Sequence, residues 1–204
     1  MGADTGLQNF VERFAVGLAA VDARRPVAFN QRSGSPFSPG IGPHTESETL
    51  RLIMEELASG PDSPYRDRFS LEVPYLSAKR SKCDLCLGHA PDWDWCIEVK
   101  MLRLMGDNGK PNDNILMHIL SPYPQHRSAV TDCAKLLGSG LSGRKALVIF
   151  GYEYPGWPLE PTISAFEILA GRSVDLGPRL TANFSGLIHS VHQRGAVFGW
   201  ELVG

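Results

Sequence analysis

The stretch SKCDLCLGHAPDWDWCIEVKM, residues 81–101, decides the fold class of this chain. Two apolar runs within it are separated by a Gly-, Pro- and Asp-containing turn, so it predicts two antiparallel strands joined as a hairpin. Charged residues nevertheless lie inside both runs, Asp84 in the first and Glu98 and Lys100 in the second. Charges in strands that are otherwise apolar indicate a functional site.

Strand alternation places the charges of the second run together. Successive side chains of a strand point to opposite faces, so Ile97 and Val99 share one face while Glu98 and Lys100 share the other. Residues two apart in a strand are separated by about 7 Å. Taken alone, this pair is also explained by an exposed salt bridge on a solvated sheet face.

Asp84 shifts the interpretation toward catalysis. The hairpin can bring it beside Glu98 on one face, and two neighbouring buried carboxylates repel each other unless a cation neutralises them. Mg²⁺ prefers oxygen ligands of this kind, and the backbone carbonyl of Val99 can add another. Lys100 would then orient a metal-bound water and offset charge that develops on the transition state.

The rest of the chain surrounds the hairpin with alternating helices and strands. The order α-α-β-β-β-α-β-α-β predicts an α/β fold with a mixed sheet. The patterns of apolar residues and turn signals place helices at 7–23, 125–137 and 162–171, and strands at 69–76, 81–87, 94–101, 144–153 and 196–203. A further helix opens at residues 44–48 and is ended by Gly60-Pro61.

The second helix carries a carboxylate on its apolar side. Thr45 is the expected N-cap, with Glu48 three residues later completing a capping box. At 100° per residue Glu46 falls on the buried stripe, whereas Glu48 points away from it. The stripe itself consists of Leu50, Ile53, Met54 and Leu57.

An Asp on one strand followed by Glu-x-Lys on the next resembles the core of the PD-(D/E)XK, or restriction endonuclease-like, nuclease superfamily. The resemblance covers about residues 44–152 and implies an αβββαβ core with a mixed central sheet flanked by helices. It places the first acid of the motif on Asp84, the second on Glu98 and the lysine on Lys100. The glutamate that many of these nucleases carry on their first helix falls on Glu46.

The resemblance implies a single nuclease domain over residues 1–204 that hydrolyses DNA, as an endonuclease in restriction, defence or repair. Mg²⁺, with Mn²⁺ as a substitute, would be held by Glu46, Asp84, Glu98 and the carbonyl of Val99. A homodimer is one expectation. The loops 26–43 and 102–122, or a separate recognition subunit, would read the DNA. The alternative is a nuclease-fold subunit that binds nucleic acid and acts with a partner, although the intact catalytic set speaks against it.

Two other aspartates compete for the first acidic position. A literal Pro-Asp occurs at Pro91-Asp92, but in the expected turn, and Asp94 lies at the edge of the strand. Asp84 is preferred because it lies within a strand. Cys83 and Cys86 have CxxC spacing, but Asp84 and Leu85 between them suit a strand better than the tight turn of a zinc knuckle, which favours small apolar side chains in a core hairpin. An iron–sulfur cluster is disfavoured because three of the four cysteines lie inside the hairpin.

A formal net charge of −2 gives no overall attraction to a polyanion, so DNA contacts require local groups. Trp93 and Trp95 are candidates for stacking on a flipped base or for the core. The N-terminus lacks the pattern of a signal peptide and no apolar run could span a bilayer, so the cytoplasm is the expected location, with no membrane contact. The polar residues expected to touch DNA are Lys79, Arg80, Lys82, Arg103, Gln125 and Arg127.

Overall fold

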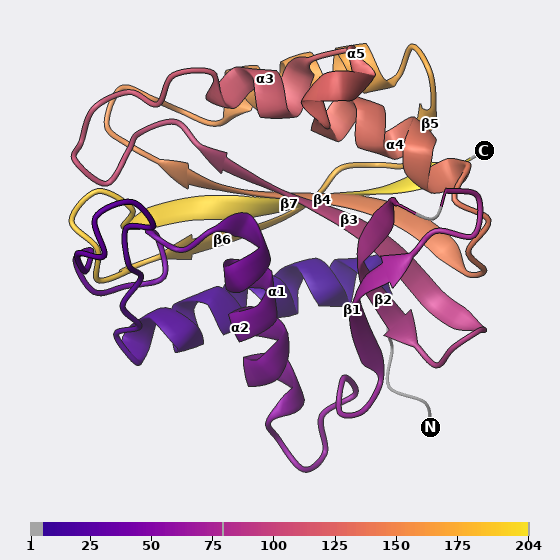
Figure 1. Cartoon of the computed structure of the whole chain (residues 1–204), viewed down its shortest axis with the longest axis horizontal. Helices are drawn as coiled ribbons and strands as arrows, with labels where there is room; N and C mark the ends of the chain where they lie inside the picture. The colour runs from indigo at the N-terminus through magenta and orange to yellow at the C-terminus, as the bar shows by residue number, and fades with distance from the viewer. Residues whose placement is uncertain (1–5, 79, 204) are drawn as a thin grey trace.

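A seven-stranded mixed sheet forms the centre of the molecule, with helices on both faces (Figure 1). The computed structural model describes residues 6–78 and 80–203. The helices are α1 (Leu7–Ala23), α2 (Glu46–Ala58), α3 (Ile115–Leu120), α4 (Ala129–Leu137) and α5 (Glu160–Ala170), with a 3-10 turn η1 (Pro124–His126). The strands are β1 (Phe69–Pro74), β2 (Lys82–Gly88), β3 (Trp93–Arg103), β4 (Arg144–Glu153), β5 (Asp175–Leu176), β6 (Leu180–Ser185) and β7 (Arg194–Val203).

The strands follow the order β1-β2-β3-β4-β7-β5, and β6 also pairs with β7. β3 and β4 are parallel, and the chain between them crosses over through α3 and α4, whereas every other pairing is antiparallel. The predicted mixed sheet flanked by helices is therefore confirmed. β4 lies between β3 and β7, which explains why its sequence RKALVIFGYE is an almost unbroken apolar run.

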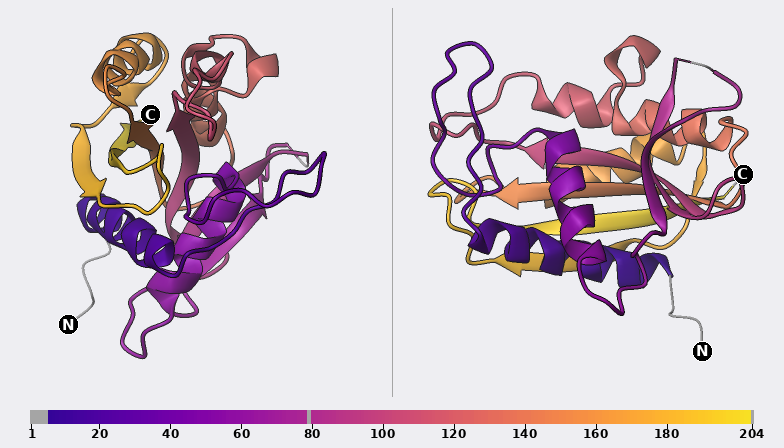
Figure 2. Two further views of the ribbon diagram at one scale, coloured as in Figure 1. Left: turned by 90° about the vertical axis from the view of Figure 1, so that its left-hand side faces the viewer. Right: turned by 60° about the horizontal axis from the view of Figure 1, so that its bottom comes forward.

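The helices divide between the two faces of the sheet (Figure 2). α1 and α2 cover one face, where Ile97 and Val99 of β3 join the core, and α3, α4 and α5 cover the other. Alternation along β3 therefore directs Glu98 and Lys100 toward α4. One strand thus supplies apolar side chains to one layer and charged side chains to the other.

The structure also corrects several expected elements. The helix expected at 125–137 begins at Ala129, because Ser128 is its N-cap and accepts a hydrogen bond from the amide of Thr131 at 3.2 Å. Gln125 lies in η1 and Arg127 has a left-handed backbone, so neither is on α4. The sequence patterns missed α3, β5 and β6, which are at most six residues long and too short to show a clear period.

No helix in the described part of the chain is long and apolar enough to cross a membrane.

Candidate active site

The site forms where β2 and β3 stop pairing. Their last paired residues are Leu85 and Ile97, and one further step of this register would place Asp84 opposite Glu98. The strands separate there instead, so the Asp84 carboxylate accepts a hydrogen bond from the backbone N–H of Val99, at 2.9 Å. A side chain thus replaces the strand partner that β3 has lost.

α2 supplies a carboxylate to the same open edge of β3. Glu46 accepts a hydrogen bond from the backbone N–H of Met101 at 2.5 Å. Thr45 caps α2 as predicted, accepting from the amide of Glu48 at 3.3 Å, and this fixes Glu46 at the first position of the helix. The Glu48 carboxylate bonds to Arg51 instead, so Glu46 is the glutamate that reaches β3.

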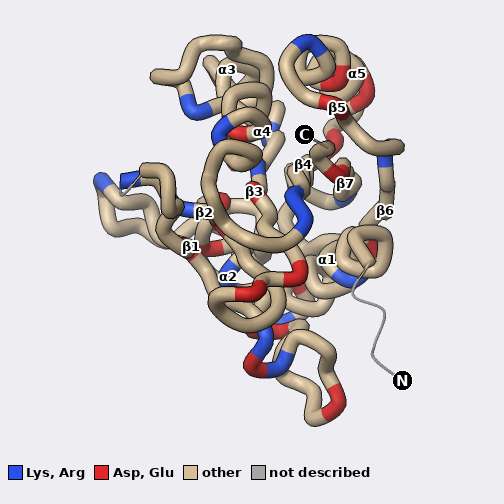
Figure 3. Tube along the Cα trace, turned by 90° about the vertical axis from the view of Figure 1, so that its right-hand side faces the viewer, with Lys and Arg blue, Asp and Glu red and all other residues tan. Residues whose placement is uncertain are grey.

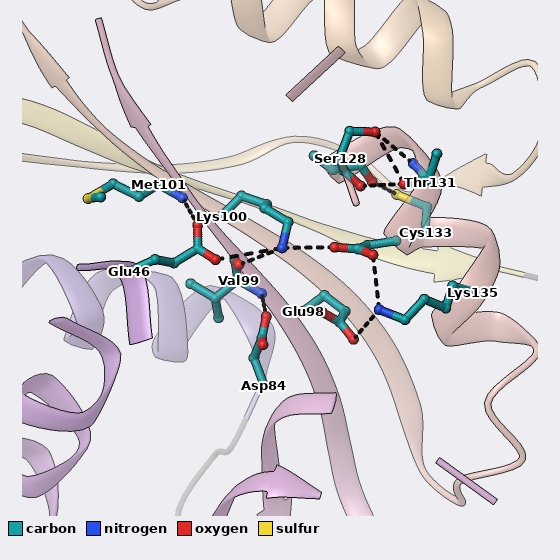
Figure 4. Close-up of polar contacts among 12 residues, drawn as sticks. Glu46, Asp84, Glu98, Val99, Lys100, Met101, Ser128, Thr131, Cys133 and Lys135 are labelled. Atoms are coloured by element: carbon teal, nitrogen blue, oxygen red, sulfur yellow. Dashed lines mark hydrogen bonds and ion pairs between the residues drawn. The ribbon is translucent and has the colours of Figure 1, made fainter. Parts of the chain in front are cut away.

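Lys100 connects the two helix layers across this open edge (Figure 4). Its Nζ lies 2.8 Å from Asp132 Oδ2 on α4, 3.6 Å from Glu46 Oε1 on α2 and 3.4 Å from the carbonyl oxygen of Val99. Burial alone would lower the pKa of this ammonium, but the charges of Glu46, Asp132 and Asp84 outweigh burial and raise it. Lys100 therefore stays protonated at neutral pH.

Glu98 is the most deeply buried of the predicted site carboxylates, with 2% of its surface exposed. It accepts a hydrogen bond from the hydroxyl of Tyr75, and Lys135 Nζ lies 3.9 Å from its Oε1. Burial, followed by the nearby charges of Asp84 and Asp132, raises the pKa of Glu98 well above its ordinary value. Burial likewise raises the pKa of Glu46.

Asp132 and Lys135 belong to the site but were not predicted as site residues. Asp132 is 2% exposed, and its Oδ1 lies 3.0 Å from Lys135 Nζ. The helical pattern predicted one apolar face at positions 130, 134 and 137, but Ala134 is exposed and Leu137 only half-buried. The residues of α4 that are buried are Ala129, Val130, Asp132, Cys133 and Leu136. Positions 129, 133 and 136 also follow a helical period, and a buried face that includes them contains Asp132. A buried carboxylate requires a cationic partner.

Four acidic side chains, from Glu46, Asp84, Glu98 and Asp132, face the two amino groups of Lys100 and Lys135, so acidic groups outnumber basic groups by two. A cavity of about 330 Å³ opens beside them. It is lined by Glu46, Ser47, Glu48, Leu50, Arg51, Leu71, Glu72, Asp84 and Val99. Excess negative charge beside a cavity fits a small cation that fills the space between the acids.

The donor set fits a hard divalent ion, because it consists of carboxylate and carbonyl oxygens. Asp84 uses Oδ2 on the backbone N–H of Val99, which leaves Oδ1 for a ligand, and Glu46 uses Oε2 on the N–H of Met101 while its Oε1 lies 3.6 Å from Lys100 Nζ. The carbonyl of Val99 has only the distant contact with Lys100. Within residues 6–78 and 80–203, however, no three His, Cys, Asp or Glu side chains already converge as a metal-ligand group, so binding requires side chains to turn.

The alternative first acids lie away from this edge. Asp92 is exposed in the hairpin turn, and Asp94 pairs with Arg68 at 2.8 Å on the surface. The cysteines are packed in the interior: all four are buried and free, and the sulfur atoms of Cys86 and Cys96 lie 3.7 Å apart across the hairpin. Of the three aspartates, Asp84 is the one whose carboxylate contacts β3 at this edge.

The residues expected to contact DNA are scattered. Lys82 pairs with Glu72 at 2.8 Å, and Arg103 donates to the carbonyl of Gly42 at 2.7 Å. Arg80, Gln125 and Arg127 are exposed, and Lys79 lies outside the described residues. Figure 3 shows basic and acidic positions interspersed along the trace. Trp93 and Trp95 are buried in the core, so they are not available to stack on a base.

No protein-family model, curated protein or solved structure matches this chain.

Proposed function

We propose that this protein is a metal-dependent nuclease that hydrolyses phosphodiester bonds of DNA. One observation carries the proposal: the unpaired edge of β3 collects Asp84, Glu46, the Val99 carbonyl and Lys100 around a cavity, with Glu98 beside them. These are the groups that phosphodiester hydrolysis needs. Carboxylates bind the cation, and a lysine contributes positive charge where negative charge develops.

Each residue has a distinct role in this proposal. Asp84, Glu98, Glu46 and the carbonyl of Val99 would hold Mg²⁺, or Mn²⁺ in its place. The ion would supply Lewis acidity at the phosphate and lower the pKa of the attacking water. Lys100 orients that water and offsets the charge of the pentavalent transition state.

Asp132 acts as a positioning residue for Lys100. It holds the ammonium at 2.8 Å from α4, while Glu46 approaches the same ammonium from α2. A lysine held from two sides loses little side-chain freedom when substrate binds, which favours catalysis through pre-organisation. Substitution of Asp132 therefore lowers turnover even though this side chain need not touch the substrate.

The biological setting follows from the reaction class. We propose an endonuclease of restriction, defence or repair, which works as a homodimer or with a separate recognition subunit. The scattered basic residues support a requirement for further contacts, because phosphate contacts by Lys and Arg supply most of the affinity for DNA. Gel filtration with and without DNA tests the oligomeric part of this proposal.

The enzymatic proposal is tested by incubating the protein with supercoiled, linear duplex and single-stranded DNA in Mg²⁺, Mn²⁺ or EDTA. We expect cleavage that depends on the metal and is lost in Lys100→Ala. Lys145→Ala is the matched control, because Lys145 is also a buried lysine, but its ammonium donates to the backbone carbonyls of Leu141, Ser142 and Gly143 at the start of β4. Equal cleavage by both variants would remove Lys100 from the mechanism. DNA binding without cleavage under any condition would favour the nucleic-acid-binding subunit.

A further inference from the structure

A second cavity, of about 510 Å³, lies beside the candidate active site. It lies between the connection that joins α1 to α2 and the start of α2, and Glu48 lines both cavities. Six residues define its character: Phe29, Phe37, Asn30, His44, Arg103 and Asp107. A ligand that extends from this cavity would therefore reach the carboxylates at β3.

One wall of the cavity is an ordered hairpin within the α1–α2 connection (Figure 2). The amide of Phe37 donates to the carbonyl of Ala28 at 2.8 Å, and the amide of Asn30 donates to the carbonyl of Ser35 at 2.9 Å. Buried Asp22 fixes the base of the connection, because its Oδ1 accepts from the amide of Ile41 at 2.8 Å. The cavity is therefore formed before any ligand arrives.

An aromatic side chain stands exposed on this wall. Phe29 has 62% of its surface accessible and neighbouring Val27 has 40%. Exposed apolar side chains that gather at a cavity with polar neighbours mark binding sites. A planar ligand would cover the ring of Phe29 and exclude water from it.

The opposite side of the cavity is polar, and two of its residues hold buried nitrogens without partners in the described part of the chain. His44 is 7% exposed and its Nε2 has no partner among the described residues, and the same holds for Nε of Arg103. Asp107 uses Oδ1 for His192 at 3.0 Å and Arg103 at 3.6 Å, and its second oxygen remains as an acceptor.

The charges of this cavity disfavour an anion as its ligand. Glu48 is paired with Arg51 and Asp107 lies 3.6 Å from Arg103, which also donates to the carbonyl of Gly42, so neither arginine is free to bind an anion. A planar group with both donors and acceptors on its edge suits the cavity better. Nucleobases have this chemistry, since each offers a π face to an aromatic ring and a polar edge to side chains.

We propose that this cavity binds an unpaired nucleobase of the DNA strand whose backbone crosses the candidate active site. The inference rests on the proposed function and adds to it a substrate class, namely single-stranded DNA or DNA with a base extruded from the helix. A base within a duplex is covered on both faces by its neighbours, so it cannot stack on Phe29 until it leaves the helix.

The test uses a single-stranded oligonucleotide carrying 2-aminopurine, with Ca²⁺ in place of Mg²⁺, and measures its fluorescence and affinity. Wild type and Trp157→Ala, a control at an exposed aromatic outside the cavity, should change the emission and bind alike. Phe29→Ala should bind about fivefold more weakly or worse, because it removes one base-stacking contact. Equal affinity of the two variants, or emission that does not change on binding, would overturn the inference.

Failure of this inference is distinguishable from failure of the proposed function. Mg²⁺-dependent cleavage by wild type with no 2-aminopurine response refutes the nucleobase cavity and leaves the nuclease proposal standing. A response that Phe29→Ala abolishes, in a protein that never cleaves DNA, supports the cavity and refutes hydrolysis.

Discussion

Removal of the Lys100 ammonium should destabilise the fold strongly. Lys100 has 11% of its side chain exposed and its partner Asp132 has 2%, so Lys100→Met removes the cation at Asp132 Oδ2 and leaves this buried carboxylate with Lys135, 3.0 Å from its Oδ1. Breaking one side of a buried ion pair costs about 3 to 5 kcal/mol of unfolding free energy. The matched change Lys82→Met removes a half-exposed ammonium from the surface pair with Glu72 and should cost at most about 1 kcal/mol.

Urea unfolding, followed by tryptophan fluorescence, measures both costs, and the slope against urea should stay unchanged if only stability differs. The double variant Lys100→Met with Asp132→Asn should be less destabilised than the sum of its single variants by about 1 kcal/mol or more. Additive effects, or a cost for Lys100→Met no larger than that for Lys82→Met, would refute the buried pair. Activity lost by Lys100 variants must therefore be measured at temperatures where the variant is folded.

Three further predictions concern the carboxylates. Because burial raises the pKa of Glu98, the native state retains a proton that the unfolded chain releases, so the stability of wild type falls as pH rises above 4.5. Glu98→Gln should weaken this fall in urea titrations at several pH values. An identical pH dependence of the two proteins would contradict the prediction. Mg²⁺ at about 100 times its dissociation constant should stabilise wild type by roughly 2.7 kcal/mol in thermal melts, but Asp84→Asn much less. Glu46→Gln should abolish cleavage in a plasmid assay, whereas Glu48→Gln should retain most of it; the reverse order would exchange their roles.

Local sequence patterns predicted much of the site, since they depend on short-range periodicity. The period of two in β3 placed Glu98 and Lys100 on one face, and the helical period of α2 singled out Glu46. The bounds of α1 and β4 also follow from their apolar patterns. Each of these features is encoded within about a dozen neighbouring residues.

The features that the sequence did not reveal depend on contacts between distant segments. The pairing of Lys100 with Asp132 is set by how α4 lies across β3, and the contact of Tyr75 with Glu98 is set by the path of the chain after β1. The separation of the strands beyond Leu85 likewise has no local signature. Hydrophobic periodicity reports which face of an element is buried, but not which charged group will face it.

The assignment of Asp84 is the central claim of this account. The most direct test compares Mg²⁺-dependent nicking and linearisation of supercoiled plasmid by wild type, Asp84→Asn and Asp92→Asn, because the two aspartates are the competing first acids of one hairpin. We predict that Asp84→Asn loses about a hundredfold or more of the rate through the loss of a metal ligand, while Asp92→Asn cleaves at the wild-type rate. Full activity of Asp84→Asn, or a loss confined to Asp92→Asn, would contradict the proposed active site.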